Sequence, residues 1–318
     1  MELIRGRHNL SARHRGCVAS IGNFDGVHRG HRAVIEGLAR RGREMGLPVT
    51  VVTFEPHPQD FFRSGFGPPR IMGFREKLEA LGALGVERVL CLRFDRKLAA
   101  LGARDFIRQM LVDGIGVRYL AVGDDFRFGR GRGGDFQLLR ECSAAGGFTV
   151  AAASTLLAGA ERISSSLIRK LLAAGRLDAA AQLMGRPLRF SGRVMHGAKR
   201  GRGWGWPTAN LSLKSMNPAV QGVFAVEAEV EAAPPLPAVA NIGRRPTVDC
   251  TAPLVEVHLL DFDGDLYGRR LRVSVVKKLR DEKKFPDSKA LRAQITRDAA
   301  QARAFFDLPV AAAAGAAP

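Results

Sequence analysis

The stretch Ile21 to His31, I-G-N-F-D-G-V-H-R-G-H, constrains the fold most strongly, because it joins two kinds of element within a few residues. An apolar run ending at Ile21 predicts a strand, and Gly22 ends that strand. A polar turn then leads into a helix rich in Ala, Leu, Arg and Glu. A short strand followed at once by a helix is typical of α/β proteins, whose ligands bind at the carboxyl ends of the strands.

Two histidines lie at this junction. His28 and His31 are three residues apart, so both imidazoles point to one side if the helix has begun. Gly30 leaves no side chain between them and lets a ligand approach the backbone. Imidazoles beside a helix N-terminus can donate to the charge that develops on phosphates, which favours a polyphosphate ligand. The alternatives are surface histidines or an H-x-x-H metal pair, but the surrounding strand, glycines and helix favour phosphate.

The same alternation continues to about residue 185. It predicts strands at 17–22, 49–54, 86–94, 117–123 and 148–153, and helices near 31–46, 74–84, 103–113 and 134–146. Apolar strands separated by helices predict a doubly wound parallel sheet covered on both faces. The stretch R-I-S-S-S-L-I-R at 162–169 opens a further helix that runs to Gly175. Its serines are ordinary helix caps or, beside two arginines and a triphosphate site, phosphate ligands.

A domain boundary is predicted near Gly185-Arg186-Pro187, where the helical pattern stops. Beyond it, strands at about 189–196, 222–231, 236–243, 254–261 and 270–277 follow without intervening helices, which predicts a small antiparallel β-barrel of the six-stranded type. A final helix is predicted at 287–305. We therefore expect an α/β domain at 1–185, a barrel domain at 186–308, and a disordered Ala-rich tail at 309–318.

The second domain has polar groups of its own. Residues 196–203, H-G-A-K-R-G-R-G, form a basic glycine-rich loop suited to phosphates. Thr208 and Asn210 alternate along a short extended segment, so their oxygens fall on one side and could ligate Mg²⁺. Glu256 shares a strand face with Leu254, His258 and Leu260. A carboxylate there is either a general base or an ordinary exposed residue.

Composition narrows the class of protein. A length of 318 residues suggests about two domains, and a net charge of +18 predicts an anionic partner. With 2 Trp and 2 Tyr, a stacking surface for single-stranded nucleic acid is not evident. The 4 cysteines are scattered and predict buried free thiols rather than disulfides or zinc. Without a long apolar run or a signal-peptide layout, we expect a cytoplasmic protein that has no membrane partner.

Taken together, these motifs resemble the bifunctional bacterial riboflavin kinase/FMN adenylyltransferase family, also called FAD synthetase. The adenylyltransferase half is matched by G-x-F-D-G-x-H-x-G-H at 22–31, T-F-E-P-H-P at 53–58, V-G-x-D-F-x-F-G at 122–129 and I-S-S-S-x-I-R at 163–169. The kinase half is matched by H-G-x-x-R-G-R at 196–202, P-T-A-N-L at 207–211, E-V-H-L-L-D-F at 256–262 and L-R-x-E-x-x-F at 279–285. The order of the motifs is that of the family.

The resemblance implies two ATP-dependent sites that use Mg²⁺. In the first, His28 and His31 would be catalytic, and FMN would attack ATP to give FAD and pyrophosphate. ATP in that site would contact Gly22, Asn23, Phe24, Asp25, Asp125, Arg162, Ser164, Ser165, Ser166 and Arg169. In the second, Glu256 would be the base that activates riboflavin, and Thr208 and Asn210 would hold Mg²⁺. ATP in that site would contact Gly197, Lys199, Arg200, Gly201, Arg202, Pro207, Thr208 and Asn210.

The resemblance also implies a flavin-side lid formed by Arg280, Glu282 and Phe285. The partners would be the small molecules ATP, riboflavin and FMN, with no nucleic acid, and the chain would be a monomer or a weak homo-oligomer. Trp204 and Trp206 replace the family's usual Leu and Phe and could alter flavin affinity. Two other classes compete: an aminoacyl-tRNA synthetase, which would need a K-M-S-K-S-like loop where 162–169 stands, and a nucleic-acid-binding protein using the Gly/Arg run at 129–134.

Overall fold

The computed structural model describes residues 1–62, 67–196, 206–213, 216–244 and 253–309, and these form two compact units. One comprises Met1–Pro68 with Lys77–Leu167, and the other comprises Pro69–Glu76 with the chain from Ile168 onward. Within the described ranges, no helix is long and apolar enough to cross a membrane.

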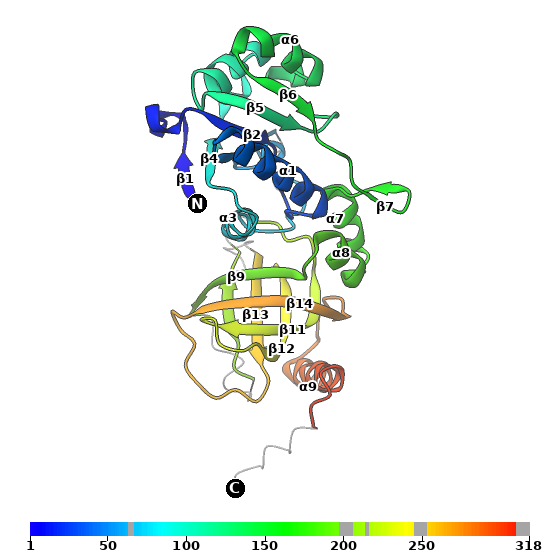
Figure 1. Cartoon of the computed structure of the whole chain (residues 1–318). Coiled ribbons are helices and arrows are strands. Elements are labelled where there is room, and N and C mark those ends of the chain that lie inside the picture. The colour runs from blue at the N-terminus through cyan, green and yellow to red at the C-terminus, as the bar shows by residue number, and fades with distance from the viewer. Residues whose placement is uncertain (63–66, 197–205, 214–215, 245–252, 310–318) are drawn as a thin grey trace. The chain divides into compact units, whose positions relative to one another are not determined.

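The first unit is built on a six-stranded parallel sheet with the order β1-β4-β3-β2-β5-β6 (Figure 1). Its strands are β1 (Glu2–Arg5), β2 (Cys17–Ile21), β3 (Val49–Glu55), β4 (Arg88–Arg93), β5 (Val117–Val122) and β6 (Thr149–Ala152). From β2 the chain adds β3 and β4 on one side, then crosses to add β5 and β6 on the other. The topological switch point therefore lies between β2 and β5.

The helices of this unit are α1 (Arg29–Met45), α2 (Pro58–Phe62), α3 (Phe74–Ala83), α4 (Arg96–Ala99), α5 (Ala103–Phe106), α6 (Phe136–Gly146) and the start of α7 (Ser165–Ala173). A π-helical turn, Ile107–Val112, continues α5, and β7 (Leu157–Ala158) and β8 (Glu161–Arg162) form a small hairpin. All five residues of β2 are buried, as expected for a central parallel strand covered on both faces. Alternate residues Cys17, Ala19 and Ile21 pack with the π-helical turn and α6, while α1 packs against β2, β3 and β5. The doubly wound fold predicted from the sequence is confirmed.

The second unit contains a closed antiparallel barrel with the order β10-β13-β12-β11-β14-β9 (Figure 1). Its strands are β9 (Leu188–Met195), β10 (Ala209–Ser212), β11 (Gly222–Val230), β12 (Leu236–Arg244), β13 (Pro253–Leu259) and β14 (Arg270–Arg280). Helix α8 (Leu177–Met184) packs against β9 and β14, and the C-terminal α9 (Ser288–Phe305) packs across β11, β12 and β14. The predicted barrel and final helix are thus confirmed.

The barrel strands alternate between a buried and a partly exposed face. On β13, Val255, Val257 and Leu259 are buried, whereas Leu254, Glu256 and His258 are partly exposed. The first set points into the barrel, and the second set lies on its outer wall. Beneath α9 the outer wall is apolar, where Ala225 packs against Ala299 and Ala302.

Several details differ from the sequence-based expectations. Strand β1 at the sheet edge and the β7–β8 hairpin were not predicted, because both are too short to show periodicity. Strand β13 ends at Leu259 rather than near 261, and Asp261 adopts a left-handed backbone with φ of 53°. Residues 310–318 of the predicted disordered tail lie outside the described part of the chain.

Candidate active sites

The loop between β2 and α1 lies at the switch point of the parallel sheet. It turns sharply, because Phe24, Gly26 and Val27 have φ values of 49°, 86° and 37°. Left-handed backbone at two non-glycine residues is uncommon and is often retained at functional sites. The Asn23 side-chain Oδ1 is buried and accepts no hydrogen bond from any residue that the structure describes. This acceptor therefore suits a ligand donor.

His28 and His31 are stacked at the start of α1. Their ring centroids lie 3.6 Å apart with an interplanar angle of 18°, and His28 is only 6% exposed. His28 caps the helix, since its Nδ1 accepts a hydrogen bond from the His31 backbone N–H at 3.3 Å. In the neutral His28 ring the proton is then on Nε2, which can donate to a phosphate oxygen. A Cβ at Gly30 would lie 3.1 Å from the His28 ring, so a larger residue at this position would crowd the imidazole.

The start of α7 is attached to the same loop. The Ser165 Oγ donates to the Asp25 carbonyl at 2.7 Å, and the Ser164 Oγ accepts from the Leu167 N–H at 3.2 Å. Ser164 therefore caps the helix, whereas Ser165 connects the start of α7 to the histidine loop. Ser166 is exposed. The serine stretch thus lies beside the histidine loop although about 140 residues separate them.

An arginine and two aspartates lie at the carboxyl end of β5. Arg162 pairs with Asp124 at 3.3 Å and with Asp125 at 3.1 Å, and all three side chains are well exposed. Exposed ion pairs of this kind contribute little to stability. Arg169 belongs to the second unit, where its Nε donates to the Pro69 carbonyl at 2.6 Å.

A polar row crosses three neighbouring strands on the outer wall of the barrel. In the strand register, Glu256 on β13 pairs with Asn210 on β10 and with Asn241 on β12. Residues directly opposite each other share a face, so the carboxylate lies between two amides. The sequence placed Glu256 among Leu254, His258 and Leu260 along its own strand. The sequence analysis named Asn210 as a candidate Mg²⁺ ligand, but it did not predict that Asn210 and Asn241 lie on either side of Glu256, because strand pairing is not visible in the alternation of one strand.

Asn210 and Thr208 line a cavity of about 210 Å³ at the mouth of the barrel, together with residues 262–267. The Asn210 Nδ2 donates to the Thr208 carbonyl at 3.4 Å, whereas its buried Oδ1 accepts no hydrogen bond among the described residues. An orphaned amide oxygen beside a threonine fits a hard cation such as Mg²⁺, which binds a few protein oxygens and the phosphates of a nucleotide. No group of three or more His, Cys, Asp or Glu side chains that could hold a metal occurs within the described ranges.

His258 connects the P-T-A-N segment to β13. Its Nδ1 lies 2.8 Å from the Pro207 carbonyl, to which the N–H form donates, and its ring contacts Trp206 edge-on at 4.9 Å. Burial lowers the pKa of His258 below the ordinary value of 6.5, although the Pro207 carbonyl acts in the opposite direction. Trp206 also packs against the cluster beneath α9. His258 therefore helps to hold the segment that carries Thr208, and the sequence analysis assigned it no role.

Arg280, predicted to belong to a flavin-side lid, is held by α9 in this structure. Its guanidinium makes a two-oxygen ion pair with Asp298, and the side chains are only 14% and 4% exposed. Glu282 and Phe285 follow it in the segment between β14 and α9, and the Phe285 ring centroid lies 5.7 Å from the guanidinium carbon. Of the remaining predicted residues, Gly197, Lys199, Arg200, Gly201 and Arg202 lie outside the described part of the chain.

Comparison with known proteins identifies both halves. Residues 10–167 match the family described as FAD synthetase, and residues 184–306 match the family described as riboflavin kinase. A solved structure titled as a macrolide-efflux protein from Streptococcus pneumoniae superposes with a TM-score of 0.79 at 27% identity, covering 95% of this chain and 99% of that one.

Curated relatives match along almost the whole chain. The bifunctional riboflavin kinase/FMN adenylyltransferase of Escherichia coli (strain K12) is 51% identical over 309 residues, covering 97% of this chain and 99% of that protein. The protein of the same name from Pseudomonas fluorescens is 50% identical, covering 96% and 97%. The one from Haemophilus influenzae is 42% identical, covering 96% and 100%. With both family models and these relatives in agreement, the chain belongs to the bifunctional riboflavin kinase/FMN adenylyltransferase family.

Proposed function

We propose that this protein makes FAD from riboflavin in two ATP-dependent steps, each at its own site. The barrel site phosphorylates riboflavin to FMN, and the parallel-sheet site transfers the adenylyl group of ATP to FMN, releasing pyrophosphate. The observation that carries this proposal is that one chain contains both the stacked histidines at a sheet switch point and the Asn210–Glu256–Asn241 row of the barrel. The functional division is proposed to follow the predicted boundary, with 1–185 for adenylylation and 186–308 for phosphorylation.

In the adenylylation step, a phosphate oxygen of FMN attacks the α-phosphate of ATP and pyrophosphate leaves. His28 and His31 donate to the phosphate oxygens where negative charge increases, and the N-terminus of α1 adds its positive dipole. Asn23 supplies a buried acceptor for a hydrogen-bond donor of the ligand. Arg162 lies at the carboxyl end of β5, where its guanidinium can bind phosphate. Positioning and electrostatics provide the rate enhancement, and no covalent enzyme intermediate is required.

In the phosphorylation step, the ribityl 5′-hydroxyl of riboflavin attacks the γ-phosphate of ATP, and ADP leaves as the bond between the γ-phosphate and the β–γ bridging oxygen breaks. Glu256 accepts the hydroxyl proton, and Asn210 and Asn241 orient its carboxylate from either side. Thr208 and Asn210 would hold Mg²⁺, which shields the phosphate charge when it is bound. His258, through the Pro207 carbonyl, keeps Thr208 in place.

The test is a time course of the purified protein with riboflavin, ATP and Mg²⁺, with the flavins separated by chromatography. The proposal predicts that FMN appears first and is then converted to FAD. FMN that accumulates without FAD would remove the adenylylation assignment. No conversion of riboflavin would remove the kinase assignment.

A further inference from the structure

Residues 206–208 precede β10 and belong to no strand. Pro207 has no N–H, so this residue cannot donate to a strand ladder. Side chains reach the segment instead, because the His258 Nδ1 lies 2.8 Å from the Pro207 carbonyl. The Asn210 Nδ2 donates to the Thr208 carbonyl at 3.4 Å. The place of Thr208 in the cavity at the barrel mouth therefore depends on side-chain contacts.

Trp206 connects this segment to the C-terminal helix α9. Its indole is partly buried and packs against a cluster of four buried residues, which are Ala225, Leu260, Ala299 and Ala302. The indole also meets the His258 ring edge-on, with centroids 4.9 Å apart and an interplanar angle of 70°. Edge-to-face pairs are a favoured aromatic geometry. One side chain thus links α9 with the histidine that contacts the carbonyl of the next residue.

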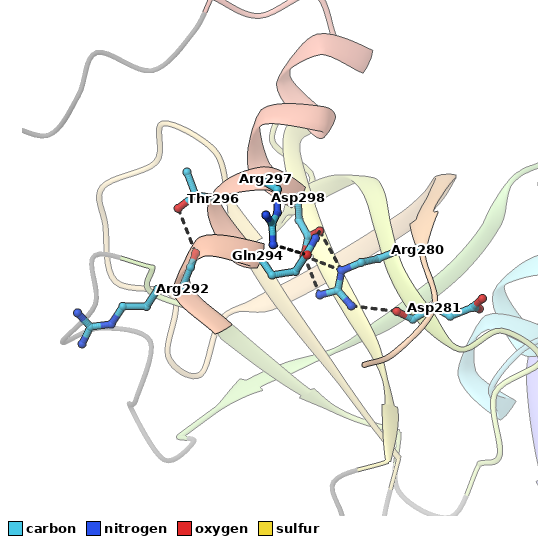
Figure 2. Close-up of polar contacts among 7 residues, drawn as sticks. All are labelled: Arg280, Asp281, Arg292, Gln294, Thr296, Arg297 and Asp298. Atoms are coloured by element: carbon cyan, nitrogen blue, oxygen red, sulfur yellow. Dashed lines mark hydrogen bonds and ion pairs between the residues drawn. The ribbon is translucent and has the colours of Figure 1, made fainter. Parts of the chain in front are cut away.

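Two ion pairs fix α9 on the barrel. Figure 2 shows the first, in which the Arg280 Nε and Nη2 donate to the Asp298 carboxylate at 2.8 to 3.0 Å. The Gln294 Nε2 donates to the same carboxylate at 2.8 Å. In the second, Arg303 near the end of the helix pairs with Asp261, which follows β13. Asp298 and Arg303 are only 3% and 8% exposed, and breaking such a shielded pair is costly. The helix therefore presents its alanines to the indole from a fixed position.

We propose that Trp206 is a positioning residue of the riboflavin kinase reaction, through which α9 sets the place of Thr208 on the nucleotide side of the site. The indole fixes the backbone that carries Thr208, directly through the chain and also through the His258 ring that contacts the Pro207 carbonyl. This role rests on the proposed kinase function. It differs from an effect on flavin affinity, because a displaced Thr208 impairs the use of ATP and leaves riboflavin binding intact.

The first experiment measures FMN formation by the wild type, Trp206→Ala and Trp206→Phe, with ATP and riboflavin varied separately. Trp206→Ala should lower kcat/KM for ATP by about 10-fold or more, with the KM for riboflavin within about two-fold of the wild type. Trp206→Phe keeps an aromatic ring against His258 and should return kcat/KM for ATP to within about three-fold of the wild type. Both variants should form FAD from supplied FMN at the wild-type rate.

A second pair of variants changes the helix and leaves residues 206–208 intact. Phe306, at the end of α9, packs against the same cluster as Trp206, whereas the neighbouring Phe305 is exposed. Phe306→Ala should lower kcat/KM for ATP by about three-fold or more, and the control Phe305→Ala should leave it unchanged. Because the chain has 2 tryptophans, a Trp204→Phe background leaves Trp206 as the single fluorophore. In that background, without nucleotide or Mg²⁺, Phe306→Ala should shift the emission to longer wavelength as water reaches the indole, and Phe305→Ala should not.

Several outcomes would overturn the inference. One is wild-type ATP kinetics in Trp206→Ala, and another is a raised KM for riboflavin with kcat/KM for ATP unchanged. An equal loss of FAD formation from FMN in Trp206→Ala would show a general folding defect instead of positioning. If Trp206→Ala unfolds at the assay temperature, Phe306→Ala decides, and wild-type ATP kinetics in that variant would overturn the inference. A wild-type protein that makes no FMN would instead contradict the proposed kinase function itself.

Discussion

At the scale of single residues, the first prediction concerns the stacked histidines that we propose for the adenylylation step. Because His28 is buried and fixed by the His31 N–H, removing its imidazole deletes a donor that no neighbour replaces in the same position. His28→Ala should lower FAD formation from FMN by about 10²–10³-fold, the loss typical of one charge-stabilising donor. FMN formation from riboflavin should be unchanged. Chromatography with each flavin supplied separately checks both rates.

The control for that variant is His8→Ala, which removes an exposed imidazole from the 3₁₀ turn Arg7–Asn9. It should leave both activities at the wild-type level. Equal loss of both activities in His28→Ala would contradict the assignment of two sites.

Glu256 gives the reciprocal prediction. Glu256→Gln keeps the shape between Asn210 and Asn241 but cannot accept the hydroxyl proton. Riboflavin phosphorylation should fall by about 10²–10⁴-fold, the usual contribution of a general base. Adenylylation of supplied FMN should persist. Phosphorylation at the wild-type rate would mean that another group is the base.

The buried cysteines give a prediction about thiol chemistry. Burial raises the pKa of Cys17 to about 11 and that of Cys91 to about 11, so neither forms much thiolate near neutral pH. In the native protein at pH 7.5 both should resist alkylation, and the partly exposed Cys142 should react faster. Mass spectrometry of peptides after a timed iodoacetamide pulse measures each site. Rapid labelling of Cys17 without denaturant would contradict the buried position of β2.

At the scale of elements, His258 makes the contact between β13 and the P-T-A-N segment sensitive to pH. Because the pKa of His258 is lowered on folding, the unfolded chain takes up the proton first as the pH falls below 6.5. The contribution of His258 to the free energy of unfolding is therefore present above pH 6.5, and it is lost as the pH falls toward the folded-state pKa of this residue. We expect the unfolding temperature to drop between pH 8 and pH 5.5, and to drop less in His258→Gln. An identical drop in both proteins would show that other groups determine it.

The helices and strands were largely predictable, because the spacing of apolar residues along the sequence indicates which side of each element is buried. Strand β3 is rich in β-branched residues and is buried at five successive positions, whereas β13 in the barrel alternates between buried and partly exposed residues, so each fold class has its own sequence pattern. Asp287 caps α9 through the Ala290 N–H at 2.7 Å, and its position just before the helical stretch fits the predicted start. Strand β1 was not predicted, because four residues are too few to show an alternation of apolar and polar side chains.

The site residues were predictable only in part. His28, Asn23 and Glu256 stand in local motifs whose residue types indicate their chemistry. Asn241 was not predicted, because its place beside Glu256 depends on the register of β12 with β13. The partner of Arg280 is a residue 18 positions away on a helix, and nothing in L-R-x-E-x-x-F indicates it. Long-range pairing of this kind is decided by the packing of whole elements.

At the scale of the whole molecule, the chain joins two unrelated folds that catalyse two consecutive reactions. Each unit contains its own polar site, one at the switch point of a parallel sheet and one on the wall and mouth of a closed barrel. The product of the barrel reaction is the substrate of the sheet reaction. The central claim is therefore that the two activities are separable by mutation and connected through FMN.

Mixing the two single-site variants tests this claim most directly. His28→Ala and Glu256→Gln are incubated with riboflavin, ATP and Mg²⁺, first separately and then together, and the flavins are separated over time. The account predicts that His28→Ala alone accumulates FMN, that Glu256→Gln alone leaves riboflavin unconverted, and that the mixture makes FAD. FAD from either variant alone at the wild-type rate, or no FAD from the mixture although each variant retains its other activity, would contradict it.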